Sequence, residues 1–314
     1  MKTCKFCVMA LSIVAILPAM ALSQSRQSAE SNGIPTHLVV TVEPHKDSGM
    51  PAINQNEVMV YEGKTRDQVT EWTPAQGEHA ALQLYILIDD SSGQSLGTQL
   101  DDIRKFIDNQ PASTQVGVAY MRNGTAQIVQ DLTADHAAAA KSLRLPLGEL
   151  GANASPYFSL SDLIKKWPSA SARRAILMIS DGIDAYYGGG DMQDPYVDEA
   201  MNLALRGGIM VSTIYSPGAG HFGHSYWQTY WGQLYMSQIA DATGGEAYYM
   251  GFTGAPVSFS PYLNEMAARL SHQYLLTFLA KPPQKAGWQK IRLTTEVPKV
   301  DLVTADRVYL SPEK

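Results

Sequence analysis

Two apolar runs end abruptly in aspartate, and these aspartates are the residues best suited to do chemistry. Residues 84–88 (LYILI) run into Asp89, and residues 175–179 (AILMI) are followed by a serine and Asp181. If the two runs are neighbouring parallel strands, Asp89, Ser91 and Asp181 converge at the carboxyl edge of a sheet, where open α/β sheets bind ligands. Carboxylates and hydroxyls without His or Cys favour a hard cation such as Mg²⁺, Mn²⁺ or Ca²⁺.

The same residues allow a plainer interpretation. Asp89 and Asp90 together could cap a helix that follows the strand. The Asp181-Gly182 pair at the end of the second run favours the cation site over that alternative. We interpret Asp90 itself as a solvent-facing or structural residue.

A second candidate surface is rich in aromatic residues. The stretch 217–232 (PGAGHFGHSYWQTYWG) follows a strand-like run, so we expect it to be a loop at the same carboxyl edge, beside the loop that holds Tyr187. Loops there often carry function, and Trp and Tyr are common anchors of binding surfaces. The alternative is that the rings pack down as a local core. The residues expected to contact a partner are Tyr187, Phe222, Tyr226, Trp227 and Trp231.

These residues must be positioned by an α/β sheet. Between residues 80 and 272, buried-strand runs alternate with segments of helical spacing, which indicates a mostly parallel sheet covered by helices. Asn123-Gly124 lies between two strand-like runs and predicts a hairpin that adds one antiparallel edge strand. The expected fold class is therefore α/β, with a doubly wound, mostly parallel sheet.

The segments on either side of this block have residue patterns typical of β-strands. Residues 36–79 contain β-branched and alternating runs separated by turn residues, and residues 273–314 return to that pattern. Because the two flanks are alike, we expect them to pair in a small β-sandwich-like region. Residues 24–35 are polar and serine-rich, and we interpret them as a flexible lead-in.

The first residues predict export. Lys2 and Lys5 precede a short apolar run at 8–22 that ends in small residues, as in a secretory signal peptide. We expect this peptide to span residues 1–23 and to be cleaved after Ser23, with a cut after Ala21 as the alternative. The run falls short of the roughly 20 residues of a spanning helix, which argues against the alternative of a membrane anchor. We expect the mature protein to be periplasmic or extracellular and to have no membrane span.

Composition narrows the classes of partner. Both cysteines, Cys4 and Cys7, lie in the predicted signal peptide, so the mature chain has no disulfide and no thiolate metal site. Removing residues 1–23 leaves 22 basic and 30 acidic side chains, a net charge of −8 with His neutral. Nucleic acid attracts clustered Lys and Arg, which this sequence lacks, so nucleic acid is not an expected partner.

Three segments together resemble the von Willebrand factor type A (VWA) domain. Residues 86–93 (ILIDDSSG) look like the Asp-x-Ser-x-Ser start of that family's metal-ion-dependent adhesion site. Residues 175–182 (AILMISDG) look like the strand that carries its second aspartate, and residues 240–245 (ADATGG) are similar to a segment near the end of the domain. The resemblance covers about residues 80–272, and the β-rich flanks are similar to those of secreted bacterial VWFA-related proteins.

The resemblance implies a site for Mg²⁺, or for Mn²⁺ or Ca²⁺. The ligands that it implies are Asp89, Ser91, Ser155 and Asp181. Ser155 matches the family's loop threonine, which stands just before a helix. The third position of the motif should be serine and is Gly93, for which Ser92 or Ser95 could substitute.

Three functions remain open. The first is a non-enzymatic binding or adhesion protein, in which the cation keeps one coordination position for an acidic side chain of a protein partner, as the VWA resemblance implies. The second is a metal-free interaction or scaffold module, which Gly93 favours. The third is a metal-dependent hydrolase, although the sequence has neither a nucleophile elbow nor a zinc-hydrolase helix. We expect the first, with no catalytic residue.

Overall fold

The structure contains two β-sheets of different kinds. The computed structural model describes residues 33–148, 151, 153–168, 171–188, 193–217, 225–249 and 257–312. The predicted signal peptide and Phe222 lie outside the described residues. Among the helices in these ranges, none combines the length and the apolar character needed to cross a membrane.

The six-stranded sheet is mostly parallel and has the order β6-β5-β4-β7-β8-β9. Every neighbouring pair is parallel except β5 and β6, a hairpin that turns through Asn123 and Gly124, both at positive φ. The mixed α/β class and this hairpin agree with the prediction. The strands are β4 (Leu82–Asp89), β5 (Thr114–Arg122), β6 (Thr125–Thr133), β7 (Arg173–Ser180), β8 (Ile209–Tyr215) and β9 (Ala247–Tyr248).

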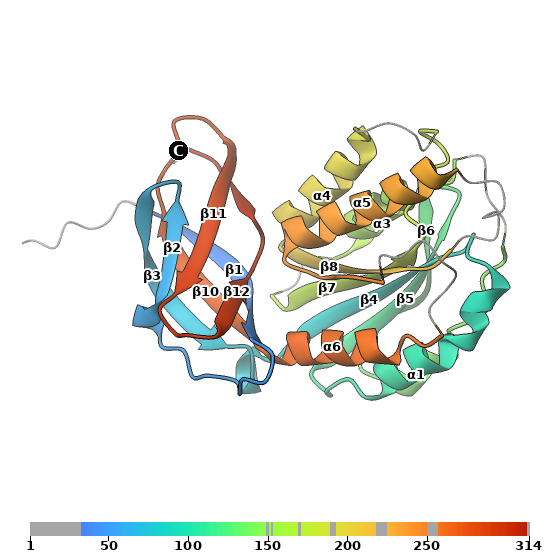
Figure 1. Cartoon of the computed structure of the whole chain (residues 1–314), viewed down its shortest axis with the longest axis horizontal. Helices are drawn as coiled ribbons and strands as arrows, with labels where there is room; N and C mark the ends of the chain where they lie inside the picture. Colours follow the sequence, from blue (N-terminus) through green and yellow to red (C-terminus); the bar gives the residue numbers. More distant parts are fainter. Residues whose placement is uncertain are drawn as a thin grey trace, which may run out of the picture. The chain divides into compact units, whose positions relative to one another are not determined.

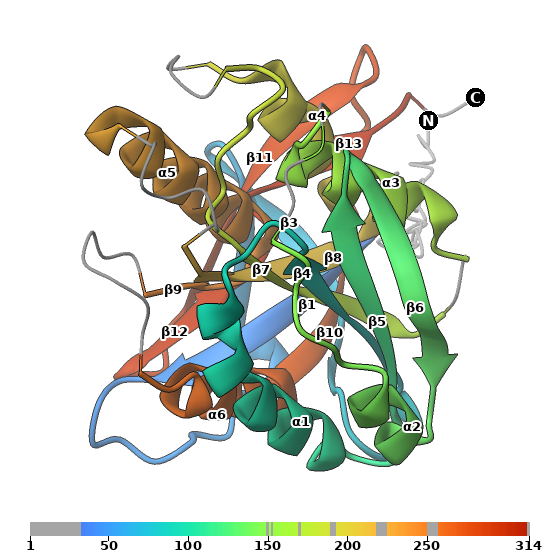
Figure 2. The ribbon, with the colours of Figure 1, turned by 90° about the vertical axis from the view of Figure 1, so that its right-hand side faces the viewer.

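Helices cover both faces of this sheet, because its central strands bury both sets of alternating side chains (Figures 1 and 2). Leu84, Ile86 and Ile88 of β4 point into one hydrophobic core, whereas Tyr85 and Leu87 point into another. The first core is covered by α1 (Leu100–Asp108), α2 (His136–Lys141) and α6 (Ser260–Ser271). The second is covered by α3 (Pro156–Lys166), α4 (Pro195–Gly207) and α5 (Tyr226–Thr243).

The chain reverses its direction across the sheet between β4 and β7. From β4 it proceeds outward to β5 and β6, and it then returns to place β7 on the other side of β4. The helices that follow these two strands cover opposite faces. The carboxyl ends of β4 and β7 therefore border a crevice, which is where open α/β sheets bind ligands.

The two flanks form a seven-stranded antiparallel sheet in the order β12-β1-β10-β3-β2-β11-β13. It curls so that β11 approaches β12, and Val40, Val60 and Phe278 are fully buried inside it. The flanks pair directly, since Thr41 of β1 lies opposite Gln273 of β10. The strands are β1 (Ile34–Pro44), β2 (Val58–Glu62), β3 (Thr65–Pro74), β10 (Gln273–Ala280), β11 (Gly287–Thr295), β12 (Val300–Val303) and β13 (Arg307–Leu310).

With this second sheet, the predicted fold class is confirmed only in part. The parallel, doubly wound description applies only to the six-stranded sheet, since all pairs in the other are antiparallel and form one continuous sheet. β1 begins at Ile34, inside the predicted lead-in, because pairing with Ala280 of β10 satisfies its backbone there. β3 carries little strand signal, because Asp67 and Trp72 are its only buried side chains.

Arginine contacts join the two sheets, which belong to one compact unit. Arg173, the first residue of β7, donates to the side-chain oxygen of Gln273, the first residue of β10. Arg206, near the end of α4, lies over the ring of Tyr309 in β13, 3.9 Å from its centroid. The antiparallel sheet is thereby packed against the amino ends of the parallel strands, and their carboxyl ends face away from it (Figure 1).

Candidate metal site

The last residues of β4 and β7 lie side by side at the carboxyl edge of the six-stranded sheet. Ile88 is opposite Ile179 in the strand register, which places Asp89 beside Ser180. The Ser180 hydroxyl donates to Asp89 Oδ2 at 2.7 Å. This hydrogen bond ties the two strand ends together at the crevice.

Asp89 is buried and is held by its own turn. Its Oδ1 accepts hydrogen bonds from the Ser91 backbone N–H at 2.9 Å and from the Ser91 hydroxyl at 2.6 Å. Burial raises the pKa of Asp89, while the hydrogen bonds from Ser91 and Ser180 act to lower it. A buried carboxylate is costly unless it is paired, so a cation beside Asp89 would offset that cost.

Ser155 and Asp181 approach the same place from other segments, and both are buried. Ser155 caps α3: its hydroxyl oxygen accepts from the Phe158 N–H at 3.2 Å, and its proton is donated to Asp184 at 2.5 Å. Asp181 directly follows β7, and its Oδ1 accepts from the Ile183 N–H at 2.9 Å. The loop after β7 and the start of α3 thus present one carboxylate and one hydroxyl.

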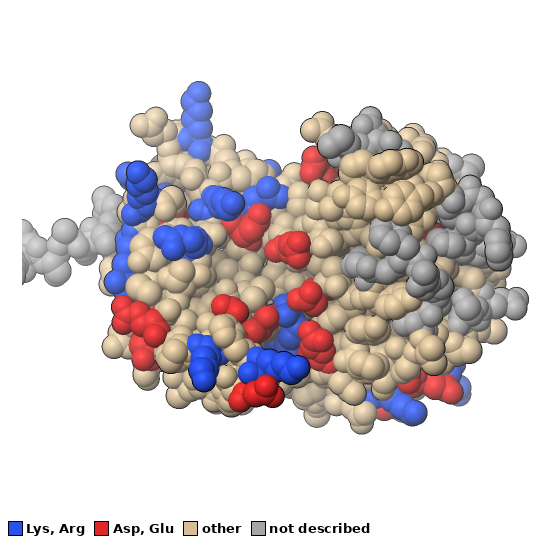
Figure 3. Space-filling view, viewed as in Figure 1, with Lys and Arg blue, Asp and Glu red and all other residues tan. Residues whose placement is uncertain are grey.

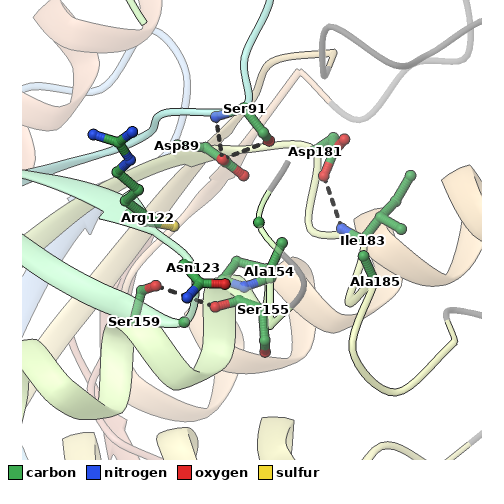
Figure 4. Close-up of a pocket in the computed structure, with 14 residues that line it drawn as sticks. Asp89, Ser91, Arg122, Asn123, Ala154, Ser155, Ser159, Asp181, Ile183 and Ala185 are labelled. Atoms are coloured by element: carbon green, nitrogen blue, oxygen red, sulfur yellow. Dashed lines mark hydrogen bonds between the residues drawn. The ribbon is translucent and has the colours of Figure 1, made fainter. Parts of the chain in front are cut away.

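A single small pocket is lined by all four ligands that the sequence predicts. Asp89, Ser91, Ser155 and Asp181 border it together with Asn123 and Arg122, whose guanidinium extends away from Asp181 (Figure 4). The cavity is about 20 Å³, which is room for one ion or one water molecule. Two carboxylates and two hydroxyls are a donor set that fits a small hard cation.

Water would have to complete the shell of such a cation. Within the described ranges, no three His, Cys, Asp or Glu side chains are grouped so that they could hold a metal ion. Mg²⁺ ordinarily has an octahedral shell and keeps several water molecules in protein sites. The pocket therefore fits an ion held by few protein ligands, with exchangeable positions left over.

The third position of the serine motif contributes no hydroxyl. Gly93 directly precedes a short 3-10 helix at Gln94–Thr98. Ser92 is fully buried, does not line the pocket, and has no hydrogen-bond partner for its hydroxyl among the described residues. The side chain of Ser95 lies outside the described residues. Ser92 is therefore not the expected substitute.

Asp90 has the structural role that was one of its two interpretations. It is 1% exposed and forms a bidentate salt bridge with Arg144, with N–O distances of 2.7 and 2.9 Å. It also accepts from the Leu147 N–H at 3.0 Å. Asp90 therefore anchors the segment that follows α2 against the end of β4.

Two further buried carboxylates, Asp184 and Asp194, lie near the site without lining its pocket. Asp184 accepts from Ser155 and from the Tyr187 N–H at 2.9 Å. Asp194 caps α4 through the Tyr196 N–H at 2.9 Å, and burial, together with the charge of Asp184, raises its pKa to about 6. An Asp-Pro pair at a helix start is a signal that could have found Asp194. Asp184 has no comparable signal.

Gly182 lets the loop after β7 pass close to α5. Its φ is +71°, and a Cβ at this position would lie 2.3 Å from the carbonyl oxygen of Gly232. Only glycine meets both conditions without strain. The glycine that follows Asp181 is thus explained by the turn and by the packing of the helix.

The aromatic residues predicted to bind a partner do not all lie in a loop. Residues from Tyr226 onward belong to α5, which begins with a capping box between Ser225 and Gln228. The loop prediction for residues 226–232 is therefore wrong, because the glycines before Ser225 obscure a helix-start signal that the sequence contains.

The described aromatic residues differ in exposure, and none lines the metal pocket. Tyr226 and Trp227 are 61% and 62% exposed, with their rings edge to face at 5.6 Å. Tyr187 is 39% exposed. Trp231 is half-buried against the core under α5 and stacks on Tyr235. Trp231 thus has the packing role of the alternative interpretation, while the other three are available at the surface.

No protein-family model matches the chain, and no curated protein matches its sequence. Among solved structures, it is similar to an aerotolerance-related membrane protein from Bacteroides fragilis, with 16% identity, 60% of this chain and 98% of that one covered, and a TM-score of 0.43. It is also similar to the conserved hypothetical protein BatB from Bacteroides thetaiotaomicron, with 16% identity, 61% of this chain and 98% of that one covered, and a TM-score of 0.44. A third similar structure is a von Willebrand factor type A protein from Catenulispora acidiphila. Its sequence is 13% identical, the match covers 90% of this chain and 75% of that one, and the TM-score is 0.45. These likenesses assign no function to the chain.

Proposed function

We propose that this chain is an exported, VWA-like protein-binding module that uses a divalent cation held by Asp89, Ser91, Ser155 and Asp181. The observation that carries the proposal is the convergence of these four oxygen donors in one pocket of about 20 Å³. Export rests on the predicted signal peptide. The binding mode, in which an acidic side chain of a protein partner completes the shell of the cation, rests on the sequence resemblance to VWA domains.

The hydrogen bonds around the pocket leave its oxygens suited to a cation. The Ser91 hydroxyl donates its proton to Asp89 and the Ser155 hydroxyl donates to Asp184. Each hydroxyl proton is therefore directed to a carboxylate, which leaves oxygen lone pairs for a metal ion. Because Asp89 and Asp181 are both buried, a bound divalent ion would also balance their charges.

The surface beside the site supports contact with a protein. Tyr226 and Trp227 begin α5, which follows the carboxyl end of β8, so they stand at the same edge of the sheet as Asp89. α5 itself has one charged residue, Asp241, which lies near its far end, and Figure 3 shows a largely uncharged surface over this helix. Exposed aromatic rings on a surface with few charges are common anchors of protein interfaces.

Two observations bear on the alternatives. Asp89 is already held by three hydrogen bonds without an ion, and Gly93 supplies no third serine, which favours a metal-free scaffold as the second candidate. A cavity of about 20 Å³ is far below the 300–1,000 Å³ of typical small-molecule sites, which argues against a hydrolase that would act in it. We therefore propose no catalytic residue.

Calorimetric titration of the chain with Mg²⁺, Mn²⁺ and Ca²⁺ tests the proposal. We expect the wild type to bind at least one of these ions, and Asp181→Asn to weaken that binding at least about tenfold, because it removes one of two charged ligands. The matched control is Asp101→Asn, an exposed aspartate on α1 that pairs with Arg104. No binding by the wild type, or an equal effect of both substitutions, would leave the metal-free scaffold as the better account.

The open coordination position has its own test. Mn²⁺ that retains an exchangeable water speeds the relaxation of solvent protons. We expect this enhancement in the Mn²⁺-loaded protein, and we expect acetate, a stand-in for a partner's carboxylate, to reduce it. An enhancement that is absent or unaffected by acetate would contradict recognition of an acidic side chain.

A further inference from the structure

A second cavity lies at the opposite, amino edge of the six-stranded sheet. Arg173 and Arg174 of β7 and Ile209 and Met210 of β8 line it, as do the end of α4 and residues of β1, β10 and β13. Figure 1 shows these strand starts beside the antiparallel sheet. The cavity is about 720 Å³, within the usual range of small-molecule sites. We call it the inter-sheet groove.

Positive charge is concentrated in this groove. Four arginines line it, against one carboxylate, Glu71, although the chain as a whole has a net charge of −6. Arg307 lies 3.6 Å from the Asp306 carboxylate. The side chains of the other three have no carboxylate partner among the described residues. Unpaired guanidinium groups that border a cavity favour an anionic ligand.

Arg173 is the most deeply placed of the four, at 9% exposure. It donates only to neutral groups, the carbonyls of Leu270 and Ala80 and the side chain of Gln273, and its Nε is buried without an acceptor in the described structure. Burial lowers the pKa of Arg173 to about 10, so it remains charged at neutral pH. A buried cation with neutral partners only is costly, and an anion in the groove would offset that cost.

Arg206 is held in an orientation that suits an anionic group. Its guanidinium lies 3.9 Å from the centroid of Tyr309 and 5.7 Å from that of Trp288. An aromatic ring under the flat face leaves the N–H groups at the edge, where they match the oxygens of a carboxylate or phosphate. No hydrogen bond from the Arg206 side chain occurs within the described residues, so these donors face solvent or a ligand.

Apart from the arginines, the groove has polar lining residues, such as Thr36, His37 and Thr277, and an apolar part. Ile209 and Met210 line it from the parallel sheet, and Leu275, Leu276 and Val308 line it from the antiparallel sheet. A ligand that fills the groove would need an anionic group for the arginines and an apolar body for these side chains. We propose that the inter-sheet groove binds a small organic anion, whose carboxylate or phosphate is held by Arg174 and Arg206. This inference does not depend on the proposed metal site.

A purely structural role is the competing explanation. Arg174 donates to the carbonyl of Gly207 at the end of α4, and Arg206 bridges α4 to β13. If the arginines only join the sheets, their loss would lower stability and the groove would not distinguish an anion from a neutral molecule. Binding and stability must therefore be measured on the same variants.

The test is a calorimetric titration of the chain in metal-free buffer with four probes. They are 1-naphthyl phosphate, 1-naphthoate, the neutral 1-naphthol, and inorganic phosphate. We expect both naphthyl anions to bind at least about tenfold more tightly than 1-naphthol and inorganic phosphate, because only they have a charged group and an apolar body. Preference for one anion over the other would identify the acid group. Equal binding of 1-naphthol, or no binding of either anion, would overturn the proposal.

Matched variants locate the binding. Arg174→Gln and Arg206→Gln should each weaken binding of the preferred anion about tenfold. Arg104→Gln, which removes a partly exposed arginine on α1, should leave it unchanged. Melting temperatures recorded alongside show whether each variant is folded, and Arg206 is exposed, so its replacement should be tolerated. Unchanged binding by a folded Arg206→Gln protein would contradict the proposed site.

Discussion

The two edges of the six-stranded sheet differ in size, in charge and in the source of their side chains. The carboxyl edge has a pocket of about 20 Å³ lined by two buried carboxylates, all from the α/β block. The amino edge has a groove of about 720 Å³ with four arginines, partly lined by the antiparallel sheet. Topology alone creates the first site, because strand order reverses between β4 and β7. The second exists because another sheet packs against the strand starts.

The largest expected effect tests how closely the carboxyl edge is packed. Gly182→Ala should lower the free energy of unfolding by about 3 kcal/mol or more, because the new methyl group meets the Gly232 carbonyl at a positive φ. Gly208→Ala at the amino edge has a φ of +59° but nothing near its Cβ position, and it should cost about 1 kcal/mol. Urea unfolding measures both, and equal losses would show that the two edges are packed alike.

A smaller effect tests the acidic character of the carboxyl edge. Burial and the charge of Asp184 raise the folded-state pKa of Asp194 from 3.8 to about 6. The folded state therefore binds the Asp194 proton more tightly than the unfolded state does. The free energy of unfolding that this protonation contributes is fully present below pH 3.8 and is lost as the pH rises through about 6.

Asp194→Asn keeps the helix cap and removes this loss. We expect the variant to be more stable than the wild type by about 1 to 2 kcal/mol at pH 7.5 and equal to it near pH 4. Thermal unfolding at both values measures the difference. Asp198→Asn, an exposed aspartate on the same helix, is the control. A gain that does not depend on pH would mean that the Asp194 carboxylate is not strained by burial.

The smallest expected effect is the coupling between the two edges. β7 spans eight residues, so the sites are separated by about 25 Å, well beyond the screening length of about 8 Å at physiological salt. Saturating Mg²⁺ should therefore change the affinity for 1-naphthyl phosphate less than about twofold. Saturating 1-naphthyl phosphate should change the affinity for Mg²⁺ by the same factor. A tenfold change in calorimetry would show that the edges communicate through the sheet.

Most of the α/β block could be predicted from local patterns. The runs at 84–88 and 175–179 are apolar at every position because both faces of β4 and β7 are covered, and Asn123-Gly124 fixes the hairpin. Strand order has no such local signal. The convergence of Asp89 and Asp181 depends on the pairing of β4 with β7, which the sequence only allows and the structure provides.

The surroundings of the site were not predictable, because they depend on contacts between distant residues. The Asp90–Arg144 pair spans 54 residues and the Ser155–Asp184 hydrogen bond spans 29. Neither leaves a periodic pattern or a turn signal. The inter-sheet groove is similar, since its arginines come from β7, α4 and β13, and the packing of the sheets alone brings them together.

The position of β1 also has a consequence for the order in which the chain folds. Its neighbours in the sheet are β10 and β12, and the contact between His37 and Thr277 spans 240 residues. A ribosome or a translocation channel therefore delivers β1 long before any partner strand exists. Such distant pairing is slow to form and leaves a strand edge open to aggregation in the meantime. Pulsed hydrogen exchange during refolding should show backbone amides protected in β4 before those in β1. We expect a chaperone that holds the unfolded chain to bind β1, the first strand to be synthesised.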